Sequence, residues 1–152
     1  MHSTTQITER TLERPQRVVG FAADVTKLEA SAIIGGLWQR AAAAGLFGGG
    51  ADAYSVYFDY QDRLADRYRV LVGVASDDEP GEGQEAVTLP AGPFVVFTDR
   101  GASVAVATAL WTSVWTTWSE RERRSFDVDF ERYEGGPEAA RVSLHLALRR
   151  TP

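Results

Sequence analysis

The sequence contains an internal repeat, and this repeat constrains the fold more than any other feature. Three pairs of segments match: YSVYFD at 54–59 with FDVDFE at 126–131, RV at 69–70 with RV at 141–142, and LW at 37–38 with LW at 110–111. Their spacings are 72, 72 and 73 residues (126 − 54, 141 − 69 and 110 − 37). Strands of similar composition can match by chance, but a nearly constant spacing through three elements favours a duplication.

Each repeat predicts the order strand, helix, strand, strand. Short apolar runs rich in Val and Tyr indicate the strands, and longer stretches without proline indicate the helices. The predicted elements are 17–23, 28–44, 53–60 and 67–75 in the first repeat, and 92–98, 103–120, 126–133 and 141–148 in the second. Neither half could bury both sides of its sheet alone, so the halves should pack about a pseudo-two-fold axis. We predict an α+β domain with an antiparallel sheet, helices on one face and a central ligand groove.

The domain boundaries follow from the repeat. Residues 1–16 are polar and are predicted to form a flexible N-terminal tail, whereas 17–150 form a single domain. Within this domain repeat one covers 17–75, an acidic loop covers 76–91 and repeat two covers 92–149. The loop is predicted because carboxylates crowd a stretch that contains Pro and Gly. They are Asp77, Asp78, Glu79, Glu82 and Glu85.

Composition excludes several classes of function. The formal net charge of −5 argues against direct binding of nucleic acid, which usually requires a basic face. The chain has no cysteine, so a disulfide framework and a thiolate metal site are excluded and a cytoplasmic location is expected. No apolar run approaches the roughly 20 residues that a membrane span needs. We predict no metal, no cofactor and no membrane partner.

The predicted strands have two different faces. Because successive side chains point to opposite sides of a sheet, the apolar residues of 126–133 place Glu131 on the other face. The same rule in 141–148 points His145 away from the helices, and the repeat pairs Glu131 with Asp59. The mixed face predicted to line the groove comprises Tyr57, Asp59, Glu131, Tyr133 and His145. A solvated outer face of an antiparallel sheet is the alternative interpretation.

Glu131 is the predicted anchor of the groove. Aromatic ring faces attract an organic cation by roughly 0.5–2 kcal/mol per good contact, and a partly buried carboxylate offers it a counter-charge. Without a ligand such a carboxylate loses hydration, so its pKa should rise. The predicted affinity for a cation therefore increases with pH.

Tryptophans mark both predicted helices. Trp111, Trp115 and Trp118 fall at i, i+4 and i+7, on one face of a helix. Packing in the core is the main interpretation for Trp111 and Trp118, whereas Trp115 is assigned to the groove. Trp38, at the matching place of the first helix, fits either role. The full set of predicted ligand-binding residues is Glu131, Tyr57, Trp115, Trp111, Trp38, Tyr133, Asp59 and His145.

Five further motifs occur in a fixed order along residues 17–149. They are LWQR at 37–40, YSVY at 54–57, LPAGPFVVF at 89–97 leading to Gly101, W-x-x-V-W-x-x-W at 111–118, and DFERY at 129–133. With these motifs the chain resembles the GyrI-like effector-binding family, which also supplies the ligand-sensing domains of bacterial multidrug-responsive transcription activators.

The resemblance implies a duplicated fold whose central groove binds lipophilic, often cationic, small molecules. The key glutamate of the family corresponds to Glu131, an aromatic position of the groove wall to Tyr57, and a bulky position on the facing helix to Trp115. Phe94 stands where the family often has tyrosine. Only about 16 residues precede the first predicted strand, too few for a helix-turn-helix domain. We therefore expect a stand-alone sensor-type domain that does not itself contact DNA.

The resemblance leaves three functions open. The first is a non-enzymatic protein for drug sensing or sequestration. The second is a hydrolase that opens the cyclopropane of alkylating natural products, with Glu131 acting on water and Tyr57, Tyr133 or His145 supplying a proton. The third is inhibition of a protein partner, as implied by the topoisomerase inhibitor that names the family, and a homodimer is equally open. The absence of a Ser-His-Asp arrangement and of cysteine favours the first.

Overall fold

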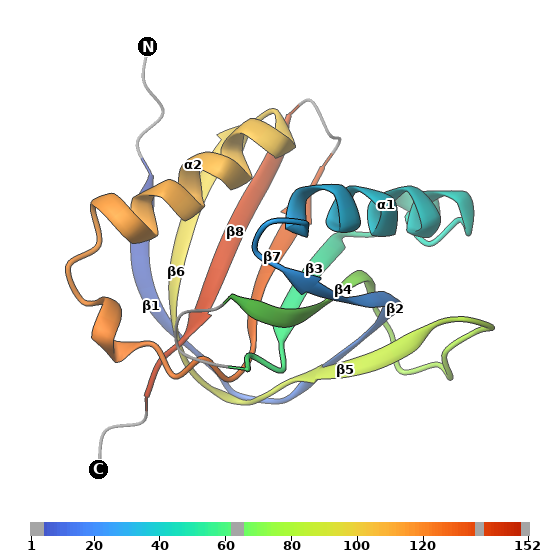
Figure 1. Ribbon diagram of the computed structural model, residues 1–152, viewed down its shortest axis with the longest axis horizontal. Helices are drawn as coiled ribbons and strands as arrows, with labels where there is room; N and C mark the ends of the chain where they lie inside the picture. The colour runs from blue at the N-terminus through green and yellow to red at the C-terminus, as the bar shows by residue number, and fades with distance from the viewer. Residues whose placement is uncertain (1–4, 62–65, 136–138, 150–152) are drawn as a thin grey trace.

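The computed structural model describes residues 5–61, 66–135 and 139–149, and it is an α+β fold (Figure 1). One sheet contains all eight strands in the order β1-β6-β8-β7-β3-β4-β2-β5, with antiparallel neighbours throughout. The strands are β1 Gln6–Leu12, β2 Gln16–Thr26, β3 Ala53–Phe58, β4 Arg67–Ala75, β5 Glu85–Leu89, β6 Gly92–Gly101, β7 Asp129–Glu134 and β8 Ala140–Ala147. The helices are α1 Ala30–Ala43 and α2 Ser103–Thr116, with short 3-10 turns at Gly48–Gly50 and Arg121–Arg123. The predicted fold class is confirmed.

The helices are held by packing more than by capping. Neither N-cap residue caps its helix with a side-chain hydrogen bond, so each helix depends on its buried face, such as Leu37 and Ala41 of α1. The end of α1 is defined by Gly45 in the left-handed conformation (φ 76°). The amide of Gly45 donates to the carbonyl of Ala42, and that of Leu46 to the carbonyl of Ala41. These bonds form a Schellman motif, which ends the helix where the Gly-rich segment begins.

The two repeats meet at the β3–β7 pair. Each repeat contributes strand, helix, strand, strand, as β2-α1-β3-β4 and β6-α2-β7-β8. The spacing is 73 residues at the helices (103 − 30) but 76 at the central strands (129 − 53), because the segment before β7 is longer. The counterpart of Glu131 is therefore Ser55 (131 − 76), which also lies opposite it in the register. Pairing Glu131 with Asp59 was wrong.

Two predicted irregular segments contain strands. Residues 6–12 of the predicted tail form β1, which pairs with β6 from Gln6↔Thr98 to Leu12↔Gly92, whereas residues 1–4 lie outside the described part. Part of the predicted acidic loop forms β5, which pairs with β2. Both strands lie at the edges of the sheet, where most side chains remain in water and no apolar run is needed. Composition therefore did not reveal them.

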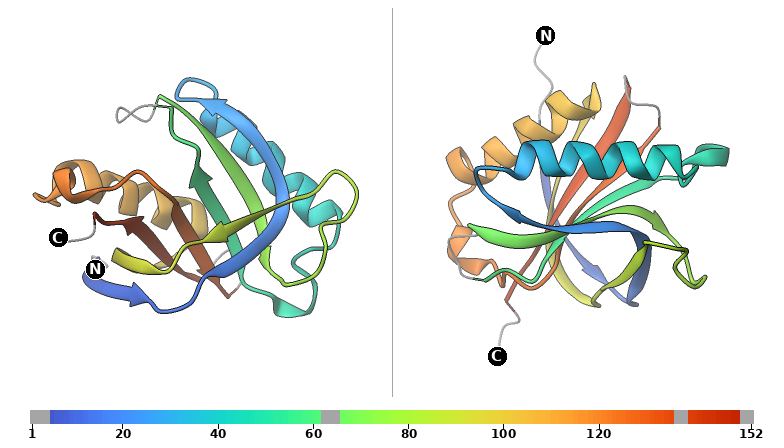
Figure 2. Two further views of the ribbon diagram at one scale, coloured as in Figure 1. Left: turned by 90° about the horizontal axis from the view of Figure 1, so that it is seen from below. Right: turned by 45° about the vertical axis from the view of Figure 1, so that its right-hand side comes forward.

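Both faces of the sheet are buried. On one face α1 packs on β2 and β4 around Val70 and Val72, and α2 packs on β6 and β8 around Leu110 and Leu144. The other face holds a second apolar cluster, which includes Tyr54, Val56, Leu71, Phe94, Val96 and Phe130. Figure 2 shows the strong bend of the sheet that encloses this cluster. Among the described residues, no helix combines the length and apolarity that crossing a membrane requires.

Two glycines allow β2 and β4 to approach closely. Gly20 lies opposite Gly73 in the register. A Cβ atom at Gly20 would lie 2.0 Å from the carbonyl oxygen of Val72, and one at Gly73 would lie 1.9 Å from that of Val19. No larger residue fits this approach without a shift of the backbone.

Candidate functional site

Glu131 lies at the centre of the molecule, where α1, α2 and the central strands meet. Its carboxylate is 3 % exposed and accepts three hydrogen bonds. The hydroxyl of Tyr57 donates to Oε2 from 3.0 Å, Nε1 of Trp111 donates to the same oxygen, and the hydroxyl of Tyr133 donates to Oε1. The donors come from β3, α2 and β7, so the carboxylate joins both repeats.

Strand register explains why these groups converge. Glu131 lies opposite Ser55 in β3 and opposite Leu144 in β8, so it shares the face of the sheet that carries the helices. Tyr57 and Tyr133 are two residues along from Ser55 and Glu131, so both point to the same face. Trp111 reaches them from α2 and packs against the apolar clusters of both helices.

Burial dominates the electrostatics of this centre. Loss of hydration raises the pKa of Glu131, and the hydrogen bonds from Tyr133, Trp111 and Tyr57 only partly oppose it. Burial, with the nearby Glu131 carboxylate, also raises the pKa of Tyr57 and of Tyr133 well above the usual range, so both stay protonated donors. The charge of the Glu131 carboxylate therefore depends on pH and on the charge of any ligand beside it.

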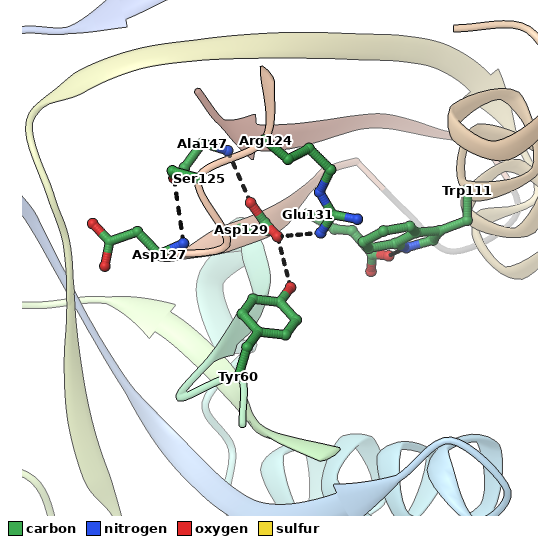
Figure 3. A network of polar contacts seen from close by, with 8 residues as sticks. All are labelled: Tyr60, Trp111, Arg124, Ser125, Asp127, Asp129, Glu131 and Ala147. Atoms are coloured by element: carbon green, nitrogen blue, oxygen red, sulfur yellow. Dashed lines mark hydrogen bonds and ion pairs between the residues drawn. The ribbon is translucent and has the colours of Figure 1, made fainter. Parts of the chain in front are cut away.

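A second buried carboxylate, Asp129, is neutralised by Arg124 (Figure 3). Nη2 of Arg124 lies 2.7 Å from Oδ2 of Asp129, and these side chains are 2 % and 0 % exposed. The hydroxyl of Tyr60 donates to Oδ2 from 2.6 Å, and the amide of Ala147 donates to Oδ1 from 2.8 Å. Sequence reasoning missed Arg124, because it ends the charged run RERR at 121–124, which resembles a solvated segment.

Aromatic rings surround the Arg124 guanidinium. Its Cζ atom lies 4.1 Å from the centroid of the Phe126 ring and about 6 Å from the rings of Tyr60, Trp111 and Trp115. Ring faces stabilise a cation through their quadrupoles, most strongly where water is excluded. The guanidinium of Arg124 therefore lies among four aromatic rings, here called the aromatic box, and pairs with the carboxylate of Asp129.

Two pockets flank the central carboxylate. The large pocket, of about 750 Å³, is lined by residues that include Trp38, Phe47, Ala53, Val104, Tyr133 and Ala140. The small pocket, of about 280 Å³, is lined by residues that include Lys27, Tyr57, Tyr68, Trp111, Trp115 and Arg124. Tyr133 faces the first and Tyr57 and Trp111 face the second, so every donor to Glu131 also forms part of a pocket wall.

Five of the predicted ligand-binding residues surround Glu131 or its pockets. Tyr57, Tyr133 and Trp111 bind the carboxylate directly. Trp38 meets the Tyr133 ring edge-on at 5.0 Å in the large pocket, and Trp115, 52 % exposed, lines the small one. Trp111 thus combines the predicted packing with a polar contact.

Asp59 and His145 are not part of this centre. Asp59 follows the end of β3 with φ 52° and is exposed. His145 lies opposite Phe130 and on the face away from the helices, where its ring stacks on that of Phe130 at 4.1 Å. Burial there lowers the pKa of His145 to about 4. The prediction that His145 faces away from the helices is confirmed, but grouping it with Glu131 on one face was wrong, because alternation within each strand does not fix which faces of two paired strands coincide. Asp59 was wrongly added to this face because β3 ends at Phe58.

The surroundings of Glu131 bear on the chemistry open to its carboxylate. Oε2 accepts two hydrogen bonds from the protein and Oε1 accepts one, so a carboxylate with about four acceptor sites keeps capacity at Oε1. His145, a predicted proton source, is separated from Glu131 by the sheet. The described residues contain no group of three or more His, Cys, Asp or Glu side chains placed to hold a metal ion.

Known proteins share this fold. An integron cassette protein from the Vibrio cholerae mobile metagenome superimposes with a TM-score of 0.77 at 23% identity, covering 95% of each chain. SAV2435, solved bound to tetraphenylphosphonium, gives a TM-score of 0.71 at 17% identity, covering 98% of this chain and 94% of that one. YobU of Bacillus subtilis (strain 168) is 30% identical over 103 residues, and the match spans 63% of each chain.

A family model matches nearly the whole described domain. It is the model of the GyrI-like small molecule binding domain, and it covers residues 5–146. The matched segment runs from the residue before β1 to the penultimate residue of β8, and it includes Glu131 and its three hydrogen-bond donors. The chain belongs to the GyrI-like small molecule binding domain family.

Proposed function

We propose that this protein binds a lipophilic aromatic cation in the large pocket and serves in drug sensing or sequestration. One observation carries the proposal. The pocket has a volume of about 750 Å³ and its lining residues carry no formal charge, yet Tyr133 in its wall donates to the buried carboxylate of Glu131. An apolar cavity with one polar anchor is typical of a small-molecule site.

The pocket walls suit a delocalised cation. Trp38 packs against Phe47 at 5.5 Å and against Tyr133 at 5.0 Å between ring centroids, so several ring faces and edges border one cavity. Each good cation–ring contact contributes about 0.5–2 kcal/mol. Glu131 adds a counter-charge behind Tyr133, and its attraction is less screened than that of a surface charge because Glu131 is buried.

A related structure supports the ligand class. SAV2435 has the same fold and was solved with tetraphenylphosphonium, a bulky aromatic cation. At 17% identity this likeness gives no residue roles, but it makes the compound a suitable first probe.

Calorimetry tests the proposal. Tetraphenylphosphonium should bind the protein, and neutral triphenylphosphine oxide, which has similar rings, should bind about tenfold more weakly. Trp38→Ala should weaken binding of both compounds, whereas Glu131→Gln should remove the preference for the cation. Ser55→Ala, on the same face but outside both pocket walls, is the matched control. Equal affinity of the wild type for both compounds would refute the cation preference.

A further inference from the structure

The charged side chains that line the small pocket differ in sign from the carboxylates of Asp129 and Glu131, which lie behind its wall. Of the residues that line it, Lys27 and Arg124 are basic and none is acidic. The remaining walls are mostly aromatic, with Tyr57, Tyr68 and Trp115 among them. At about 280 Å³ the pocket is large enough for one or two fused rings.

Arg124 has hydrogen-bonding capacity that the protein does not use. A guanidinium has five N–H donors, and Nη2 of Arg124 is bound to Asp129. Its Nε and Nη1 are buried and have no hydrogen-bond partner within the part of the chain that the structure describes. Buried donors are nearly always paired, so two unpaired nitrogens on one side chain require an explanation.

The aromatic box does not provide that explanation. Phe126 lies 4.1 Å from Cζ, which is the spacing of a ring stacked on the guanidinium. Such contacts stabilise the positive charge but leave Nε and Nη1 without an acceptor. Each bidentate edge of a guanidinium includes Nη2, so Nε and Nη1 lie on different edges, and a ligand carboxylate can satisfy one of them through a charge-assisted hydrogen bond.

Trp115 lies beside the guanidinium in the wall of the small pocket. It lies in the last turn of α2, its ring centroid is 5.9 Å from Cζ of Arg124, and it is 52 % exposed. Rotation of an exposed indole requires no rearrangement of the core. In one position Trp115 covers the guanidinium, and in another it can stack on the ring of a bound ligand.

Lys27 supplies a second positive charge at the exposed side of the pocket. It follows β2, its side chain is exposed, and it forms no ion pair with any described residue. Such a charge attracts an anion over a distance set by salt screening and mainly accelerates association.

We infer that the small pocket is a separate subsite for a small aromatic carboxylate. The ligand carboxylate accepts a hydrogen bond from Nε or Nη1 of Arg124, and the ligand ring packs between Trp115 and the tyrosines. A cation is disfavoured there because Arg124 already occupies the aromatic box. The inference does not depend on the large pocket binding a ligand, because the two pockets share no lining residue among those described.

Three naphthalene probes test the charge preference by calorimetry. They are 1-naphthoate, 1-naphthamide and 1-naphthylmethylammonium, which share their rings and differ in charge. We expect 1-naphthoate to bind about tenfold or more tightly than the amide, and the ammonium compound to bind most weakly. Trp38→Ala, which alters only the large pocket, should leave the affinity for 1-naphthoate unchanged.

Two sets of variants assign the effect to residues. Arg124→Met combined with Asp129→Asn removes a buried ion pair without leaving a charge and should abolish the preference for the acid over the amide. Lys27→Glu should weaken the binding of 1-naphthoate by about threefold at low salt. Arg100→Glu makes the same charge change at an exposed site on β6 and should leave this affinity unchanged.

The inference fails if the acid and the amide bind equally to the wild type. It also fails if the double variant, folded by circular dichroism, keeps the preference for the acid. Should the double variant not fold, Lys27→Glu decides, because an unchanged affinity for 1-naphthoate in that variant would overturn the subsite.

Discussion

Ser55 lies directly opposite Glu131 in the β3–β7 pair, where the two repeats meet. The pseudo-two-fold axis therefore relates the carboxylate of Glu131 to the hydroxyl of Ser55. Both side chains are buried, at 0 % and 3 % exposure, so a second charge here would have no water to stabilise it.

Ser55→Asp should destabilise the protein by about 3 kcal/mol or more at neutral pH, because two buried carboxylates cannot both ionise. Their pKa values should rise, so the lost stability should return as pH falls from these raised values and should be complete below the values of the unfolded chain. Urea unfolding at several pH values measures this. The neutral variant Ser55→Ala should show no such pH dependence, and a flat profile for Ser55→Asp would contradict the buried pairing.

Trp111→Phe should raise the pKa of Glu131 further, because it removes a donor that favours the charged carboxylate. The loss of one hydrogen bond to a buried group should also cost about 1–3 kcal/mol of folding free energy. Titration by NMR with a labelled glutamate carboxyl measures the first effect, and denaturant unfolding the second. Trp118→Phe is the control, because Trp118 follows the end of α2 and packs on Phe97 in the core; an equal pKa of Glu131 in both variants would argue against the contact.

Affinity for tetraphenylphosphonium should increase by about tenfold as pH rises through the raised pKa of Glu131 and then level off, because only the ionised carboxylate attracts the cation. Below that pH, binding should release a proton. Calorimetry in buffers of different ionisation enthalpy detects the release. Glu131→Gln should bind with no pH dependence, whereas a wild type without proton release would exclude Glu131 as the counter-charge.

His145 should make the protein less stable as pH falls from 6.5 to about 4. Its folded pKa is lowered to about 4 from 6.5, so its contribution is complete above pH 6.5 and is lost as the unfolded chain takes up the proton. The loss should reach about 3 kcal/mol. His145→Phe keeps the stack on Phe130 and should flatten this part of the stability profile, measured by urea unfolding. An unchanged slope would mean that other groups cause it.

Asp129→Ala should cost about 3–5 kcal/mol, because it leaves the buried Arg124 guanidinium without its counter-charge. Arg124→Met combined with Asp129→Asn should recover most of this loss. Glu9→Ala breaks the exposed pair with Arg123 and should have a far smaller effect. Chemical denaturation of the three variants gives the comparison. Similar losses for Asp129→Ala and Glu9→Ala would show that burial of the first pair is unimportant.

The sequence predicted those elements whose buried apolar residues recur with the periodicity of a helix or a strand. The duplicated order and the start of α2 at Ser103 followed from such patterns. Strands β1 and β5 did not, because an edge strand can be mostly polar. They are strands because their backbones pair with β6 and β2, and their side chains give no sign of this pairing.

The site could be predicted where alternation within one strand was sufficient, and not where pairing between strands mattered. Tyr57 and Tyr133 meet at Glu131 as expected. His145 faces away from the helices as predicted, but it was wrongly grouped with Glu131, because the face of β8 relative to β7 depends on register. Phe126 has φ 56°, so the extended run predicted from it begins only at Asp129. Arg124 was missed because a buried ion pair has no periodic signature.

The pairing of β1 with β6 also sets an order of events in folding. Gln6 meets Thr98 across 92 residues of chain (98 − 6), so this contact closes a long loop and forms slowly. During synthesis β1 therefore waits, unpaired, until β6, the first strand of the second repeat, has emerged. The strand β1 thus joins the sheet only after the whole first repeat has been made.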